Sequence, residues 1–425
     1  MTASAEKTPL GPLVPLFITA GILLAGNGLQ GTLVALRGTA EGFSPVLIGV
    51  MGAAYFLGFL LACLYSPRMI AYVGHIRVFS ALAALAAAGT LALVMVIEPV
   101  LWIVTRFIMG FCFSGLFTVM ESWLGESSKK ADRARVFAIY RLVDLMSVTG
   151  GQLLLPVMGT AGFQIFGFIA ILFCLSLVPV ALSNASSPKP LEDPGFKLGV
   201  MWTISPIACI GCVTIGLTNS AFRTIGPIYA ADSGFDTRGV ALFMIAGILG
   251  GTVLQYPFSV LSDRMDRRIA VIFATAGAAL AGLYLTLLPD GHEFLIYLGA
   301  FLWGAFALPL YSLSAAHAND RAQPGQFVLV AAGLMFFFSV GAMVGPFASS
   351  LVLQWVGPKG FFAYMSLLHG SLIVITVARM VQRPETGERP RTRFVPLLRT
   401  SPAIFRLART LAERGRNGED RTVDH

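Results

Sequence analysis

Charged side chains inside otherwise apolar stretches are the residues of this chain that could do chemistry. Arg106 lies within an apolar run at 99–124, and Arg223 lies near the end of another at 200–230. Arg141 and Asp144 stand three residues apart in a third run, so they share one face of a helix. A charge at mid-bilayer costs about 3 kcal/mol on insertion scales, so such residues usually face a partner or a wet cavity. The two isolated arginines therefore indicate a cavity that attracts anions.

Each of these charges also has a plainer interpretation. Arg106 could anchor helix packing through backbone carbonyls or extend toward the membrane surface. Asp144 lies about 15 Å deep at 1.5 Å per residue. Burial there favours the neutral carboxyl and Arg141 favours the carboxylate, so the two effects compete. If burial wins, Asp144 with Arg141 could couple a proton; if the pair neutralises itself, its role is structural.

Uncharged polar side chains accompany the arginines at helical spacing. Asn219 stands one turn before Arg223, and Asn27 and Gln30 share a face in the first apolar run. Trp303 and Tyr311 lie in a run at 294–317. These residues are candidates for the lining of a cavity, although polar side chains also hold membrane helices together. His317 is the final residue of the run at 294–317, and we expect it to be solvated.

Composition excludes a soluble protein. Only 12% of the 425 residues are charged, against roughly 25% in soluble domains, and 56% are hydrophobic. The five cysteines all fall in apolar stretches, without the spacing of a metal site or a disulfide framework. No phosphate-binding loop and no clustered catalytic constellation is present. We therefore expect no cofactor, no metal and no enzyme activity.

The apolar runs predict an all-α integral membrane protein with twelve transmembrane helices in two six-helix bundles. They lie at 10–36, 45–66, 76–97, 99–124, 134–157, 160–183, 200–230, 238–261, 268–288, 294–317, 325–355 and 359–381. The predicted units are an N-terminal bundle at 1–183, a linker at 184–199, a C-terminal bundle at 200–382 and a basic tail at 383–425. Most Lys and Arg fall in loops that lie on one side if both termini are cytoplasmic. This rule accounts for the net charge of +8 without nucleic acid, and the tail is expected to bind anionic lipid or to be disordered.

The two halves contain matching short basic loops. The first, at Ser66–Phe79, reads SPRMIAYVGHIRVF, and its counterpart at Ser259–Phe273 reads SVLSDRMDRRIAVIF. Two parallel six-helix halves are a repeat pattern of secondary transporters. The second loop, the segment Arg106-Phe-Ile-Met-Gly110 and the segments MESWLGE and RARVFAIYRLVD together resemble the major facilitator superfamily, most like its YcaD-like branch. Ala71 stands where the first loop would carry the signature aspartate.

The resemblance implies which loop residues form a gate that opens and closes one end of the path. In the first half these are Gly74, Arg77, Glu121, Arg133 and Arg135. In the second half they are Asp263, Arg264, Arg267 and Arg268. The resemblance also implies that the first, fourth, seventh and tenth helices line the central cavity.

These observations predict a proton-coupled secondary transporter of a small organic solute that works by alternating access. We expect a monomer in a bacterial inner (plasma) membrane. Positive charge in the cavity favours an anionic substrate. One alternative is an exporter of amphiphilic drugs, which the aromatic residues Phe111, Phe113, Phe117 and Trp303 would suit. A membrane sensor without transport is the other.

Overall fold

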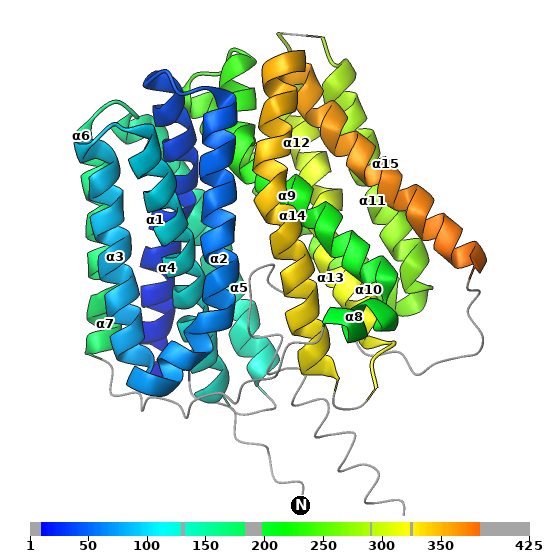
Figure 1. Ribbon diagram of the computed structural model, residues 1–425, viewed down its shortest axis with the longest axis horizontal. Helices are drawn as coiled ribbons and strands as arrows, with labels where there is room; N and C mark the ends of the chain where they lie inside the picture. Colours follow the sequence, from blue (N-terminus) through cyan, green and yellow to red (C-terminus); the bar gives the residue numbers. More distant parts are fainter. Residues whose placement is uncertain (1–9, 129–131, 183–197, 290, 324–325, 383–425) are drawn as a thin grey trace, which may run out of the picture.

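The computed structural model describes residues 10–128, 132–182, 198–289, 291–323 and 326–382, which form helices joined by short loops and contain no strand (Figure 1). The basic tail and the linker between the halves, with the exception of its last two residues, lie outside the described residues. The all-α architecture predicted from the apolar runs is confirmed.

Each predicted span of the first half corresponds to a helix or a helix pair. After a short 3₁₀ turn at Gly11–Leu13, these are α1 (Val14–Ala40), α2 (Pro45–Val73), α3 (His75–Met95), α4 (Pro99–Glu126), α5 (Arg133–Met158), α6 (Phe163–Leu175) and α7 (Leu177–Ala181). The sixth span is interrupted at Ser176, which makes it a pair of helices.

The second half repeats this order with two interrupted spans. Its helices are α8 (Leu198–Ile204), α9 (Pro206–Asp232), α10 (Thr237–Arg264), α11 (Arg267–Leu287), α12 (Glu293–Ala307), α13 (Leu310–Asn319), α14 (Phe327–Val356) and α15 (Pro358–Gln382). Pro309 separates α12 from α13, because a proline cannot donate the backbone hydrogen bond that would continue the helix.

Within the described residues, ten helices or helix pairs are long and apolar enough to cross a membrane. The helices α5 and α9 are not among the ten, although they contain 26 and 27 residues. Both carry polar residues that the sequence singles out, namely Arg141 and Asp144 in α5 and Asn219 and Arg223 in α9. A more polar helix is expected where it faces protein or a water-filled cavity instead of lipid.

The helices form two groups, with α1 to α7 on one side of the molecule and α8 to α15 on the other (Figure 1). Between the groups, α2 packs on α14, α1 on α9 and α5 on α10. We call the end with residues 74, 265 and 320 the inner end, because the sequence predicts it to be cytoplasmic, and the opposite end the outer end.

Glycines bring the two groups into close contact near the outer end. A Cβ added at Gly49 of α2 would lie 2.7 Å from the Pro346 carbonyl oxygen of α14 and 2.8 Å from Ser350 Cβ. At Gly52 it would lie 2.6 Å from Thr224 Cγ2 of α9. These distances leave no room for a side chain, so α2 and α14 approach as closely as they do because both positions are glycine.

Candidate functional site

A pocket lies between the two helix groups, toward the outer end from the middle of the molecule. Its empty volume, which includes space open to solvent, is about 460 Å³, and it is lined by Asn27, Gly31, Val34, Ala35, Ile48, Met51, Gly52, Tyr55, Phe56, Arg106, Arg223 and Thr224. The lining comes from α1, α2 and α4 of the first half and from α9 of the second. Of the predicted cavity residues, Asn27, Arg106 and Arg223 are therefore brought together here.

Arg106 is buried in this pocket without a counter-charge. Its side chain is 7% exposed, and its guanidinium carbon lies 4.4 Å from the centre of the Tyr55 ring. A cation over an aromatic face is attracted by the ring, but by less than a carboxylate would supply. Within the described part of the chain, Arg106 makes no ion pair and no hydrogen bond. Because arginine cannot lose its proton in a protein, this buried charge remains uncompensated.

Arg223 adds a second positive charge to the same pocket. Its side chain is exposed, and the described residues offer it no ion pair. One turn away, the predicted cavity residue Asn219 does not line the pocket; it is 2% exposed, and neither atom of its side-chain amide has a hydrogen-bond partner among the described residues. None of the described residues that line the pocket is acidic. Two cations without a carboxylate give the pocket a positive potential.

Three other predicted cavity residues lie elsewhere. The Nε2 atom of Gln30 donates to the Thr90 hydroxyl of α3 at 2.8 Å, so this side chain faces the interior of the first half. Trp303 is fully buried and stacks on Phe222, with 4.7 Å between the ring centres. Tyr311 is also fully buried, against Phe338. None of the three lines the pocket.

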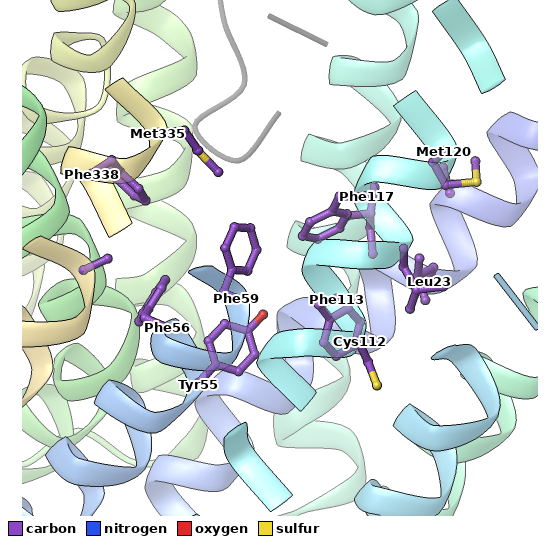
Figure 2. Packing of buried hydrophobic residues seen from close by; sticks show 14 of the residues in the cluster. Leu23, Tyr55, Phe56, Phe59, Cys112, Phe113, Phe117, Met120, Met335 and Phe338 are labelled. Carbon is purple, nitrogen blue, oxygen red and sulfur yellow. The ribbon is translucent and has the colours of Figure 1, made fainter. Parts of the chain in front are cut away.

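The aromatic residues expected to form a drug-binding wall are mostly packed in the core as well. Phe113 is fully buried, and its ring centre lies 5.2 Å from that of Phe173. Phe117 lies beside Phe113 (Figure 2). The aromatic rings that do line the pocket are those of Tyr55 and Phe56 in α2.

Arg141 and Asp144 form the ion pair that their spacing predicts. The Nη1 atom of Arg141 lies 2.7 Å from the Oδ2 atom of Asp144. The two side chains are 42% and 22% exposed, respectively. They do not line the pocket. Of the two interpretations left open by the sequence, self-neutralisation is the one with a formed contact in this structure.

The signature loop of the second half forms a network of charges. Arg267 of α11 is 3% exposed, donates to the Ser262 hydroxyl at 2.9 Å, and pairs with Asp320 at the end of α13 and with Asp263 of α10 at 3.3 Å. Arg268 pairs with Asp266 at 2.8 Å. Arg264 is exposed. Each of these contacts joins two residues of the second half.

The corresponding residues of the first half are arranged differently. Gly74 ends α2 and starts α3 with φ +85°, and Arg77 is exposed. Glu121 is 1% exposed in α4, and Arg135 is exposed on α5. The side chain of Arg133 lies outside the described residues.

Sequence reasoning missed Tyr55, Phe56 and Thr224 of the pocket. Their residue types are common in any membrane helix, so composition does not mark them. A signal for Tyr55 exists in retrospect, since Gly110 lies one turn after Arg106 and lacks room for a Cβ against the Tyr55 backbone. That glycine brings α2 and α4 together and so places the ring beneath the guanidinium.

Comparison with known proteins agrees with this architecture. The family model of the Major Facilitator Superfamily matches residues 16–289 and 208–412. An uncharacterized MFS-type transporter of Yersinia pestis is 22% identical over 384 residues, which cover 88% of this chain and 97% of the relative. The uncharacterized MFS-type transporter YcaD of Shigella flexneri is 23% identical over 347 residues, 80% of this chain and 88% of the relative.

Solved structures show the same fold. The nucleoside transporter NupG matches with a TM-score of 0.71 at 14% identity, over 88% of this chain and 100% of that one. A bacterial homologue of the human lysosomal transporter Spinster, in an inward-facing and unoccupied conformation, matches with a TM-score of 0.64 at 12% identity. The match covers 95% of this chain and 98% of that one. The helices, their order and these matches define a multi-pass membrane protein with a transporter fold. The chain belongs to the Major Facilitator Superfamily.

Proposed function

We propose that this chain is a secondary active transporter of a small organic anion, and that the substrate binds in the pocket beside Arg106 and Arg223. The observation that carries the proposal is the uncompensated guanidinium of Arg106, 7% exposed, in a pocket with no described acidic lining residue. A buried charge without a partner is costly. A carboxylate or phosphate ligand would satisfy it through bidentate hydrogen bonds, and Arg223 would attract the same ligand.

The pocket lies where alternating access would need it. It is lined by both halves of the chain, so a rocking motion of one six-helix bundle (1–183) against the other (200–382) would change its exposure. The close contact of Gly49 with Pro346 would close the outer end in this conformation. We further propose that the protein is a monomer in the inner (plasma) membrane, with both termini cytoplasmic and the tail on anionic lipid.

Proton coupling is part of the proposal, with Asp144 as the residue to test. Its ion pair with Arg141 stabilises the carboxylate, so protonation would have to break that contact. Coupling through this pair would then link protonation to movement of α5 against α10. Replacement of Asp144 by asparagine should abolish the dependence of uptake on a pH gradient, while exchange of substrate without a gradient persists.

The substrate proposal is tested by ligand-induced stabilisation of the purified protein. A panel of small carboxylates, organophosphates, sugars, amino acids and cationic amphiphiles is screened for an increase in melting temperature. We expect anions to stabilise the wild type, and Arg106→Gln to remove the effect. Arg238→Gln is the matched control, because it removes an exposed arginine of α10 that does not line the pocket.

Two results would overturn the proposal. Stabilisation by cationic amphiphiles alone would favour the exporter of amphiphilic drugs. Equal stabilisation of wild type and Arg106→Gln by anions would place anion binding outside this pocket. Anions that pass the screen are then assayed for saturable, gradient-dependent flux in proteoliposomes.

A further inference from the structure

A second pocket lies within the second half of the chain, at the inner end. Its empty volume, which includes space open to solvent, is about 370 Å³, and it is lined by Ile204, Ser205, Pro206, Ile207, Arg268, His317, Arg321 and Arg379. These residues come from the α8–α9 junction, from α11, from α13 and the turn after it, and from α15. The pocket shares no lining residue with the candidate substrate site.

Three arginines face this pocket, and none of its described lining residues is acidic. The charge of Arg268 is balanced by Asp266, whose Oδ2 lies 2.8 Å from Nη2 and 3.1 Å from Nε. Arg379, one turn before the end of α15, makes no hydrogen bond or ion pair within the described residues. Its charge is therefore available to a ligand.

His317 contributes a buried polar wall. Its side chain is 4% exposed, so the expectation of a solvated histidine is wrong. The burial follows from the packing of α13, whose residues from Leu310 to Ala318 are all buried. Its ring interacts electrostatically with three arginines, Arg321, Arg268 and Arg267, and with one acid, Asp266.

The start of α9 supplies a further positive element. Ser205 is the N-cap of this 27-residue helix, and its hydroxyl accepts from the Ala208 N–H at 3.2 Å. The first-turn N–H groups of a helix carry partial positive charge, and anions are stabilised there. The helix end and the arginines thus converge on one space from different elements.

We propose that this pocket binds a phosphate-bearing anion. Arginine guanidinium groups match phosphate oxygens in bidentate geometry, and the start of α9 adds the positive end of its helix dipole. A bound phosphate would join the start of α9, the end of α13 and the end of α15. Two sources have this chemistry, namely the headgroup of an anionic phospholipid and a soluble phosphate.

The test uses the full-length protein in nanodiscs of neutral phosphatidylcholine. One arm adds phosphatidylglycerol to the nanodisc, and a second arm titrates inorganic phosphate into the buffer. The melting temperature is measured in each arm for wild type, Arg379→Gln and the control Arg264→Gln. Arg264 is an exposed arginine at the same end, outside the pocket.

We expect at least one arm to stabilise the wild type and Arg264→Gln. Loss of one charge-assisted contact should weaken binding to Arg379→Gln by about tenfold or more. Stabilisation by phosphatidylglycerol alone identifies a lipid headgroup, and stabilisation by phosphate in neutral nanodiscs identifies a soluble ligand. Arg379→Gln must keep the wild-type melting temperature in neutral nanodiscs without phosphate, and Arg379→Lys, which keeps the charge, should retain part of the effect.

The proposal is wrong if neither arm stabilises the wild type. It is also wrong if Arg379→Gln gains as much stability as Arg264→Gln in both arms, because the anion would then bind elsewhere. Neither result bears on the proposed substrate site, because the two pockets share no lining residue.

Discussion

The loop between α2 and α3 and the loop between α10 and α11 occupy the same place in the two halves, yet different residues fix the start of the helix that follows each of them. In the second half, Arg267 begins α11 and pairs with Asp320 at the end of α13. In the first half, His75 begins α3, and its Nε2 shares a hydrogen bond with the Ser122 hydroxyl of α4 at 2.8 Å. Both contacts join the start of the third span to the inner end of the fourth.

The comparison teaches that, at this joint, the start of the third span can carry an arginine that pairs with a carboxylate or a histidine that bonds to a hydroxyl. The ring of His75 also packs on Trp123 at 6.0 Å, so apolar burial takes part in the first joint. Ala71 is exposed where the second loop has Asp263, four residues before the arginine. The substitutions below test whether the two joints differ as these contacts imply.

Loss of Arg267 should have the largest effect on stability. Arg267→Met would leave Asp320 and Asp263 without this partner, and breaking a buried ion pair costs about 3–5 kcal/mol. Thermal unfolding of the purified protein should show a large drop in melting temperature. Arg264→Met, which removes an exposed arginine from the same loop, is the control and should change little.

A double substitution distinguishes charge from packing in this joint. Adding Asp320→Asn to Arg267→Met removes the unpaired carboxylate and should recover part of the lost stability. If the double variant is as unstable as the sum of the single variants, Arg267 acts through packing and the ionic description of this joint fails.

The backbone at Gly74 should give the second largest effect. Its φ of +85° and ψ of 164° lie in a region that is essentially restricted to glycine, and other residues there cost about 1–3 kcal/mol. Gly74→Ala should therefore lower the melting temperature. The residue that follows α10 is Met265, with φ −125° and ψ 173°, so Met265→Ala should carry no backbone penalty and serves as the comparison.

Removal of the Ser122 hydroxyl should cost less than either of these. Ser122→Ala takes one hydrogen bond from the His75 ring, and such a bond contributes about 1 kcal/mol. We expect a small drop in melting temperature that does not change with salt concentration. A drop as large as that of Arg267→Met would mean that the first joint is not weaker than the second.

The sequence predicted the helices well because hydrophobic length is a strong signal in membrane proteins. It predicted less of the joints and of the candidate site. Asp320 was not recognised as the partner of Arg267, because 53 residues separate them and only the packing of α11 on α13 brings them together. Gln30 shares a helix face with Asn27, but its side chain donates a hydrogen bond to Thr90 of α3 and therefore does not point into the pocket.

Arg106 shows where residue type alone is informative. A charge within an apolar run requires an explanation, so the arginine is conspicuous, whereas Tyr55 beneath it is an ordinary membrane residue. The sequence therefore marks the charged half of this contact. The aromatic half depends on the close approach of α2 and α4 at Gly110, which only the fold reveals.

The smallest effect is expected from supplying the first loop with the acid that it lacks. Ala71→Asp places a carboxylate four residues before His75, where the second loop has Asp263 before Arg267. Because position 71 is exposed and Arg77 is exposed as well, any new ion pair should contribute less than about 1 kcal/mol. Thermal unfolding at low and high salt would measure it. A large, salt-sensitive gain in melting temperature would show that the first joint can form an ionic contact like the one between Asp263 and Arg267 in the second.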